Sequence, residues 1–401
     1  MRVTHVITRL VVGGAQENTV ATVFGLLGRP GIDIDLISGP TTGPEGSLEP
    51  VFSSSPELLT IVPQLVRPLH PWKDVLALRR LTKLLRERRS DVVHTHSGKA
   101  GVLGRLAARR AGIPVIIHHI HGPSFGPFQG PVANCFFTIA EKIAAKATTH
   151  FVCSANAMTR LYLAAGIGRP EMYTRVLSGF NVEPFLQAQA EPELRARLGI
   201  PQDAFVIGKI ARLFQLKGHE DLLQAFKIVQ PDWPSARILF VGGGPLRAQL
   251  EARARELDLQ DKVVFAGLVP PNEIPRYVAI MDCLAHLSSR EALSRALPQA
   301  LAGAKPVVSY DFDGADEICL HGETGFLVRT GDSQAAGRYL LQLARDSALR
   351  DRFGARGREF VRQNFRVEQM VDILQELYTR LLSQKGSACS PAGSNPNCAR
   401  T

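Results

Sequence analysis

Short apolar runs alternate with longer segments of helical periodicity along most of the chain. In the first half, the runs fall at residues 3–12, 32–38, 91–96, 115–120, 150–153 and 176–178. In the second half, they fall at residues 204–210, 237–241, 263–265, 282–286 and 306–309. Between many of them, apolar residues recur every three or four positions, as on one face of a helix. This alternation predicts an α/β fold of doubly wound sheets, in which ligands gather where strand ends meet helix beginnings.

The chain is long enough for two domains, and its composition changes near the middle. Residues 181–197 are rich in Pro and Gln and carry mixed charge, which is typical of a hinge. We therefore predict a first domain over residues 1–185 and a second over residues 186–365. Residues 366–383 have the pattern of one more helix, and the Ser, Pro and Gly residues of 384–401 predict a disordered tail.

Composition excludes several classes of protein. The chain has 401 residues, of which 45% are hydrophobic and 21% charged, as expected for a globular protein. Arg2, His5 and Arg9 interrupt any apolar signal peptide at the N-terminus. The longest run without Asp, Glu, Lys or Arg, residues 111–140, is broken by four prolines and is no normal membrane-spanning helix. Because the six cysteines form no CxxC pair, we expect free thiols and a cytoplasmic location.

The formal net charge of +10 needs a physical explanation. Solvated helix faces account for most of it, and an anionic substrate or a membrane surface for some. The helix predicted around residues 75–89 has an apolar stripe backed by Arg and Lys. It is either a helix with a solvated outer face or a surface that docks on anionic lipid. No basic run is interleaved with aromatic residues, so nucleic acid is not an expected partner.

Glycine and basic residues follow several predicted strands. Gly13 and Gly14 come after the first one, and two residues without side chains let another molecule approach the backbone closely. As a dinucleotide signature they are weak, because the third glycine is missing. Arg212 and Lys217 follow the strand at residues 204–210. Two fixed cations about 4 Å from phosphate charges are each worth up to a few kcal/mol at an effective dielectric constant of roughly 20.

The stretch from Ser288 to Ser309 combines a polar turn, a helix and a buried strand. Glu291 stands at the entrance to the helix, and Gln299 lies eight residues further on. Eight residues of regular helix span about 12 Å, enough to contact two parts of one elongated ligand. The first turn carries no further acid, so its free N–H groups favour an anion there. A nucleotide diphospho-sugar has the required length and charge.

These patterns resemble the retaining glycosyltransferases of family 4. Glu291 and Gln299 stand at the acidic positions of the family's Glu-x7-Glu motif, with Gln in place of the second Glu. Arg212 and Lys217, followed by glycine, match its Arg-x4-Lys-Gly motif. The segment DVVHTHSGKAGVLGRLAARRAGIPVIIHHIHGPSF, which contains His121, is similar to the amino-terminal domain of enzymes that build exopolysaccharide or lipid-linked glycans.

The resemblance covers about residues 1–380 and implies the GT-B architecture. In that architecture two Rossmann-like domains face each other across a cleft, and the C-terminal helix crosses back to the first domain. We find no internal repeat beyond these two domains.

The resemblance also assigns roles in binding the donor. It implies that Glu291 contacts the donor sugar and that Gln299 holds the ribose hydroxyls. A neutral amide forgoes a charge-assisted hydrogen bond that is stronger by about 1 kcal/mol. Arg212, Lys217 and the helix end near Ser294 are expected to hold the diphosphate.

Further roles fall on residues nearer the predicted cleft. The resemblance implies that Gly267 and Val269 read the nucleotide base through backbone groups. It places His121 beside the donor sugar at the reaction centre, so that Glu291 and His121 are the expected catalytic residues. Gly13 and Gly14 are expected to face donor and acceptor across the cleft.

The resemblance implies a retaining glycosyltransferase that uses neither a metal nor another cofactor. The co-substrate is expected to be a nucleotide-sugar, with UDP favoured over GDP, and the acceptor a glycan or polyprenyl-linked glycan of cell-surface polysaccharide synthesis. The two Asp-x-Asp sequences do not argue for a metal, because residues 33–35 lie within a strand and residues 311–313 lie beyond the diphosphate helix. Such a protein is expected to rest on the inner face of the cytoplasmic membrane.

Two observations leave alternatives open. Because Gln299 departs from the motif, the chain could instead be a binding module that holds a nucleotide-sugar without turning it over. His94 and His96 end a predicted strand and could bind a metal, but no third ligand is spaced to help. We therefore expect these two histidines to have a structural or substrate-lining role.

Overall fold

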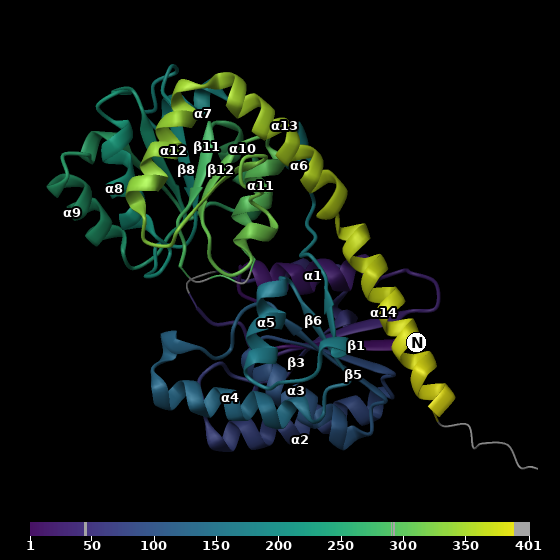
Figure 1. Ribbon diagram of the computed structural model, residues 1–401. Helices are drawn as coiled ribbons and strands as arrows, with labels where there is room; N and C mark the ends of the chain where they lie inside the picture. Colours follow the sequence, from purple (N-terminus) through teal and green to yellow (C-terminus); the bar gives the residue numbers. More distant parts are fainter. Residues whose placement is uncertain (44–45, 290, 292, 389–401) are drawn as a thin grey trace, which may run out of the picture.

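The computed structural model describes residues 1–43, 46–289, 291 and 293–388. Within these residues the chain forms two parallel β-sheets, each covered by helices on both faces (Figure 1). The carboxyl ends of the strands in one sheet face those in the other across the space between the domains.

The first sheet has seven strands among the described residues, in the order β3-β2-β1-β4-β5-β6-β7. Its strands are β1 (Arg2–Ile7), β2 (Asp33–Ser38), β3 (Leu59–Ile61), β4 (Val92–His96), β5 (Val115–Ile120), β6 (His150–Cys153) and β7 (Tyr173–Arg175). The helices are α1 (Gly14–Leu26), α2 (Pro71–Arg88), α3 (Gly98–Ala111), α4 (Pro131–Ala145) and α5 (Asn156–Ala164). The strand order reverses between β1 and β4, which is where doubly wound sheets bind ligands.

The second sheet has six strands in the described part of the chain, in the order β10-β9-β8-β11-β12-β13. They are β8 (Val206–Ile210), β9 (Arg237–Val241), β10 (Val263–Gly267), β11 (Cys283–His286), β12 (Val307–Tyr310) and β13 (Gly325–Val328). The helices are α8 (His219–Val229), α9 (Arg247–Glu256), α10 (Ile274–Ala279), α11 (Ala296–Ala302), α12 (Ser333–Arg345) and α13 (Ser347–Asn364). This is the classic dinucleotide-fold order, with its reversal between β8 and β11.

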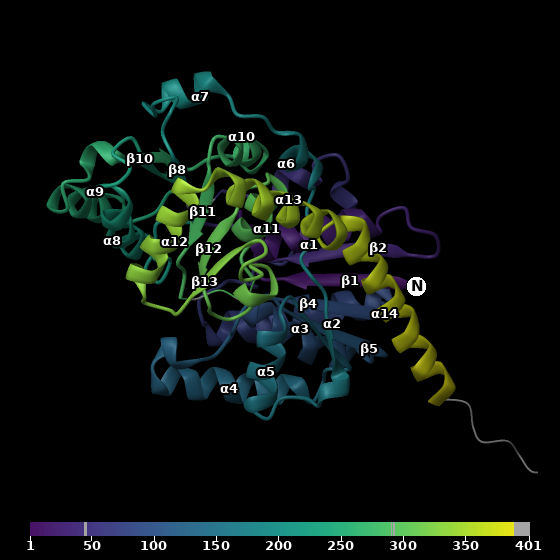
Figure 2. The same cartoon turned by 45° about the horizontal axis from the view of Figure 1, so that its top comes forward.

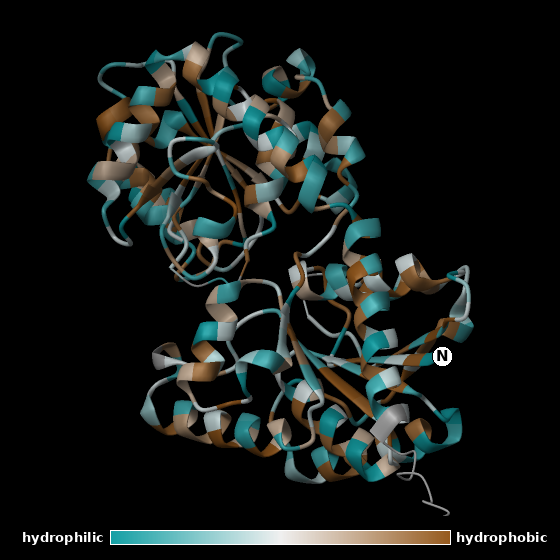
Figure 3. Ribbon diagram, turned by 45° about the vertical axis from the view of Figure 1, so that its right-hand side comes forward, coloured by the Kyte–Doolittle hydropathy of each residue, from teal (hydrophilic) through white to brown (hydrophobic). Residues whose placement is uncertain are grey.

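Hydrophobic strands form the middle of each domain because both faces of a parallel sheet are covered by helices. Figure 3 shows brown strands surrounded by helices banded in brown and teal. In the first domain, Val3, Ile7 and Val92 are fully buried against one layer of helices. This packing fixes the strand ends that carry the polar residues.

The chain passes between the domains twice, and the two crossings are bonded to each other. The Phe180 N–H donates to the Phe365 carbonyl at 2.9 Å, and Phe180 also forms a parallel bridge with Arg366. A side chain at Gly179 would lie 2.8 Å from the Arg366 carbonyl oxygen, so only glycine fits this approach. After the second crossing, α14 (Val367–Ala388) runs back along the first domain and packs against α1 (Figures 1 and 2).

A carboxylate of the second domain adds a contact between the domains. Glu317 accepts hydrogen bonds from the Asn156 N–H at the start of α5 and from Arg175, at 2.6 and 2.8 Å. A negative group is favourable at a helix N-terminus, where N–H groups are otherwise unpaired. Glu317 therefore links the second domain to α5 and β7 of the first.

The structure corrects several boundaries predicted from the sequence. The first strand, expected over residues 3–12, ends at Ile7. Residues 176–178 are not a strand: Val176 makes one backbone bond to Cys153, after which the chain leaves the sheet to pair with Phe365. The predicted hinge holds two short helices, α6 (Glu183–Gln187) and α7 (Pro192–Arg197). The tail was predicted to begin at residue 384, but α14 continues to Ala388; residues 389–401 lie outside the described residues. The domain boundaries after residues 185 and 365 stay predictions.

No helix in the described ranges is both long enough and apolar enough to cross a bilayer.

We expect Gly25→Ala to destabilise the protein, because the added methyl group would clash with α14 and push it away from α1. A β-carbon at Gly25 would lie 2.6 Å from Val371 Cγ2 and 3.1 Å from Val367 Cγ1. Overpacking of this kind costs about 1–3 kcal/mol, which exceeds the gain of up to about 1 kcal/mol in helix propensity. Urea unfolding measures the difference. The matched control is Gly386→Ala, where a β-carbon meets nothing within 4 Å. Equal stability of the two variants would contradict the docking of α14.

Candidate functional site

A cavity of about 690 Å³ lies between the carboxyl ends of the two sheets. Its walls come from both domains, with the glycine turn after β1 on one side and the loops after β8, β9 and β11 on the other. Its lining includes glycines, charged residues and polar residues from both domains: Gly13, Gly14, Glu17, Arg212, Lys217, Gly242, Gly243, Gly244, Val269, His286, Glu291, Ser294, Arg295 and Gln299. The place where the strand order of the second sheet reverses, between β8 and β11, therefore faces the space between the domains.

The loop after β8 carries two basic residues into this cavity. Arg212 stacks over the ring of Phe214, with 5.0 Å between its guanidinium carbon and the ring centre. Lys217 forms an ion pair with Glu291, which lines the same cavity. Gly218 allows this turn, because its φ is +68° and a β-carbon there would collide with the Leu287 carbonyl. Gly218 therefore shapes the end of the loop that carries Lys217, directly before α8.

The glycine turn after β9 supports the loop that carries Arg212. The Leu213 N–H donates to the Gly243 carbonyl at 2.9 Å, and the Gly242 N–H donates to the Gly267 carbonyl at 2.9 Å. A β-carbon at Gly244 would collide with the Leu213 carbonyl oxygen. Three adjacent loops are therefore held together by their backbones, and the glycines are needed for that close approach.

The segment before α11 brings Glu291, Ser294 and Gln299 to the cavity. The Glu291 N–H donates to Asp313 at 3.2 Å, which holds the backbone of this loop. Ser294 Oγ accepts from the Ala296 N–H at 3.2 Å, so this N–H of the helix start is already bonded. The neighbouring residues 290 and 292 lie outside the described residues.

An ion pair joins the domains at the edge of the cavity. Arg295 lies 3.2 Å from Glu17 of α1, and both side chains are mostly buried. A β-carbon at Gly14 would lie 3.3 Å from Arg295 Cδ, so the glycine turn leaves room for this arginine. Gly14 therefore admits a side chain from the other domain, and both Gly13 and Gly14 line the cavity.

A buried lysine lies beneath the cations of the second domain. Lys209 of β8 is fully buried, and its Nζ has no hydrogen-bond partner among the described residues. Burial, and secondarily the charge of Lys217, lowers the pKa of Lys209 to about 7. Burial also keeps His286 neutral by holding its pKa well below the usual value. The floor of the site is thus polar but weakly charged.

Two family profiles match the chain, one on each domain. The profile described as "Glycosyl transferase 4-like domain" matches residues 14–176, and the profile "Glycosyl transferases group 1" matches residues 190–360. The chain belongs to the glycosyltransferases that combine these two domains.

Relatives and solved structures agree with this assignment. The glycosyltransferase is 26% identical over 393 residues to the Escherichia coli UDP-Gal:alpha-D-GlcNAc-diphosphoundecaprenol alpha-1,3-galactosyltransferase, covering 96% of this chain and 98% of the relative. It is 29% identical to the putative glycosyltransferase EpsD of Bacillus subtilis, covering 76% of this chain and 81% of that one.

The fold comparison confirms the predicted GT-B architecture. Anabaena Alr3699/HepE, solved in complex with UDP and glucose, superposes with a TM-score of 0.80 at 21% identity, covering 95% of this chain and 100% of the other. WaaG, a glycosyltransferase involved in lipopolysaccharide biosynthesis, gives 0.69 at 14% identity, covering 98% and 100%.

The glycosyltransferase brings most of the predicted site residues together. Eight of them line one cavity: Gly13, Gly14, Arg212, Lys217, Val269, Glu291, Ser294 and Gln299. Gly267 is not among its described lining residues; its carbonyl accepts from the Gly242 N–H. His121 is not among them either; its ring packs on His119 with 3.9 Å between ring centres. The predicted roles of these residues in binding and catalysis stay predictions.

Sequence reasoning missed Glu17, Arg295, Lys209 and His286. Arg295 follows Glu291 by four residues, but nothing in the sequence pairs it with Glu17 in the other domain. Of these four, only Lys209 could have been noticed from the sequence, because a charged residue inside a predicted buried strand is unusual.

The unfolding free energy of the glycosyltransferase should rise with pH between about pH 7 and pH 10 because of Lys209. The unfolded chain, in which the lysine has its usual pKa of 10.5, holds the proton in this range, whereas the folded chain releases it above about pH 7. The unfolded state then binds more protons, so stability increases with pH by on the order of 1 kcal/mol per unit. Urea unfolding at several pH values measures this slope. Lys209→Met should flatten it, whereas Lys227→Met, at an exposed position of α8, should not. Parallel slopes in wild type and Lys209→Met would refute the assignment.

Proposed function

We propose that the protein is a retaining glycosyltransferase that moves a sugar from a UDP-sugar to a lipid-linked glycan acceptor in cell-surface polysaccharide synthesis. The observation that carries this proposal is the meeting of Arg212, Lys217 and Glu291 around one cavity between the domains. Two cations on the wall of a partly enclosed site fit the doubly charged diphosphate of an activated sugar. They also stabilise the charge that builds on the diphosphate as the sugar leaves.

The nature of the donor is supported by the similar proteins. The E. coli relative is named for a UDP-Gal donor and a diphosphoundecaprenol-linked acceptor, and HepE was solved with UDP and glucose. In this chain Gln299 is a candidate to bond the ribose, since its side-chain amide can both donate and accept hydrogen bonds. Gly267 and Val269 are candidates to bind the base, and Ser294 to assist with the diphosphate.

Basic side chains, rather than a metal ion, would neutralise the diphosphate. The carboxylates among the described lining residues are Glu17 and Glu291, and each is paired with a cation, Arg295 and Lys217 respectively. Mg²⁺ is usually held by one or two carboxylates together with substrate phosphates. Carboxylates already engaged by basic residues are poor ligands for it, which supports chemistry independent of a metal.

Arrival of the donor would rearrange the Lys217–Glu291 ion pair. Phosphate oxygens can attract Lys217, which leaves Glu291 able to accept hydrogen bonds from the sugar hydroxyls. A diphosphate oxygen would then take the proton of the acceptor hydroxyl on the same face of the sugar, which retains the anomeric configuration. His121 is proposed to support the far side of the sugar.

The second candidate function is a binding module without turnover, and Gln299 favours it. Calorimetry with UDP, together with a screen for UDP release over several donor sugars, separates the two. Binding without release across donors and acceptors would favour the module.

We expect Glu291→Ala and Lys217→Ala each to lower turnover by about a hundredfold or more. Each removes one positioned electrostatic contact, and losses of that kind cost about 10²–10³ in kcat. UDP release measures the effect, and circular dichroism shows whether the variants fold. Lys227→Ala is the control, because this lysine is exposed on the same domain away from the cavity. Near-normal turnover in either site variant would reject these roles.

A lipid-linked acceptor calls for contact with a membrane, and the first domain offers a candidate surface. On α4, Val132, Phe136, Ile139 and Ile143 are exposed by 83%, 53%, 51% and 52% and share one helical stripe. On α2, Trp72 is 78% exposed, and several exposed basic residues follow it. Both helices flank α3. Apolar side chains beside basic ones suit an anionic lipid surface.

We expect the double substitution Phe136→Ser and Ile139→Ser to weaken binding to vesicles that contain anionic lipid severalfold. The variant loses two side chains that would enter the lipid, while its charge is unchanged. Co-sedimentation with the vesicles measures binding. Ile373→Ser is the matched control, because this residue is exposed on α14 rather than on the proposed surface. Unchanged binding of the double variant would argue against this surface.

A further inference from the structure

Five histidines lie on one face of the first sheet, on three adjacent strands. His5 belongs to β1, His94 and His96 to β4, and His119 to β5, with His121 just beyond its end. The register places His5 beside His94 and His96 beside His119. Alternate residues of a strand share a face, so all five rings lie together at the point where the strand order reverses.

Hydrogen bonds connect these rings to each other and to their surroundings. His5 Nδ1 and His96 Nε2 are 2.8 Å apart, and His96 Nδ1 and His121 Nε2 are 2.9 Å apart. His94 Nδ1 is 2.6 Å from the Tyr378 hydroxyl of α14, and His119 Nε2 is 3.2 Å from Ser154. The crossover helix therefore covers and orients the cluster.

Four ring nitrogens in this cluster have no hydrogen-bond partner within the described residues. They are His5 Nε2, His94 Nε2, His119 Nδ1 and His121 Nδ1, and none is accessible to solvent. An unpaired polar atom in the interior costs free energy, and several together are rare in a folded protein. Such a group of buried imidazoles is a candidate site for a ligand that ring nitrogens can bind.

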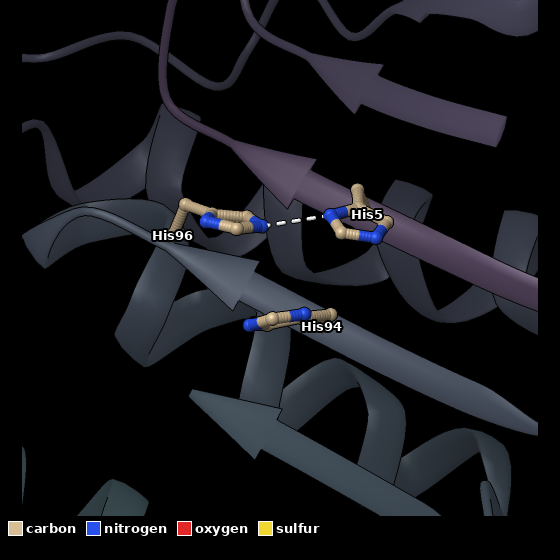
Figure 4. Close-up of side chains that lie close together, drawn as sticks. All are labelled: His5, His94 and His96. Carbon is tan, nitrogen blue, oxygen red and sulfur yellow. Dashed lines mark hydrogen bonds between the residues drawn. The ribbon is translucent and has the colours of Figure 1, made fainter. Parts of the chain in front are cut away.

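We propose that His5, His94 and His96 bind one transition-metal ion, with Zn²⁺ as the best fit. One ring nitrogen from each lies within 4.8 Å of the others, and all three side chains are fully buried. Figure 4 shows the ring of His96 directed at His5, with His94 two residues earlier on the same strand. The sequence expectation that no third ligand was available is overturned, because the third histidine comes from β1.

The bonding pattern prepares these rings as ligands. If His94 Nδ1 donates to Tyr378, its Nε2 keeps a free lone pair. If His96 Nδ1 donates to His121, its Nε2 faces His5 Nδ1, and the proton that these two nitrogens share is released when both bind the metal. Metal-binding histidines typically use their second nitrogen in this way. Burial also keeps the rings neutral, since it lowers the pKa of His5 to about 3.

The geometry requires only a small adjustment. Nitrogens bound tetrahedrally at about 2.0–2.1 Å from zinc lie about 3.3 Å apart, so the His5–His96 contact has to open by roughly 0.5 Å. Imidazole ligands suit Zn²⁺, Cu²⁺ and Ni²⁺, whereas Mg²⁺ and Ca²⁺ prefer oxygen. The three proposed ligands are not among the described residues that line the donor cavity. Metal binding at this site can therefore be tested whether or not the proposed function holds.

The test is metal binding by the untagged protein. After treatment with a chelator and dialysis, we expect wild type to take up one Zn²⁺ per chain at micromolar concentration, measured by mass spectrometry of the metal, and its melting temperature to rise by several degrees. Mg²⁺ should do neither. His94→Gln and His96→Gln should lose the bound Zn²⁺. His118→Gln is the matched control, because His118 is also buried on β5 but bonds Thr95 elsewhere; it should keep the metal.

A second measurement does not depend on removing a core histidine. Co²⁺ bound by wild type should give the visible absorption of a tetrahedral site, and Tyr378→Phe should change that spectrum or weaken binding by about tenfold or more. Zn²⁺ uptake well below one per chain in wild type would overturn the proposal, as would equal uptake by the folded His94→Gln variant.

Discussion

The pairing of the two interdomain crossings is the constraint on which the rest of the structure depends. Phe180 bonds to Phe365 and bridges to Arg366, so the chain leaves the first domain and returns to it at one place. A hinge at one point lets the carboxyl edges of both sheets face each other. The Glu17–Arg295 and Glu317–Arg175 contacts then set the separation of the facing edges. The cavity is the space that this arrangement leaves.

Within the cavity, the geometry of the backbone determines the positions of the charged side chains. Gly218 and Gly244 permit close contacts between neighbouring loops, and these loops carry Lys217 and Arg212. Lys217 is paired with Glu291, and Lys209, whose pKa burial lowers to about 7, lies below them. Arg212 and Lys217 therefore share one wall, where burial limits how far water can screen them. An anionic ligand relieves this concentration of charge.

Buried polar residues lie in both sheets near the point where the strand order reverses. In the first sheet these are the five histidines, which share one face. In the second sheet they are Lys209 near the end of β8 and His286 at the end of β11. In both domains the hydrophobic core therefore gives way to polar groups at the carboxyl ends of central strands.

The sequence by itself determined the α/β architecture and most strands, including the bounds of β5, β6 and β9. Buried parallel strands are short apolar runs, and their turns need glycine, so local pattern carries that information. It also marked Arg212, Lys217 and Glu291, because the spacing of a motif lies within one segment. Only the tertiary structure decided that residues 176–178 leave the sheet, that Arg295 meets Glu17, and that His5 joins His94 and His96. Each of these features depends on the register of strands or on the position of a second domain. The spacing of neighbouring residues along the sequence contains no information about either.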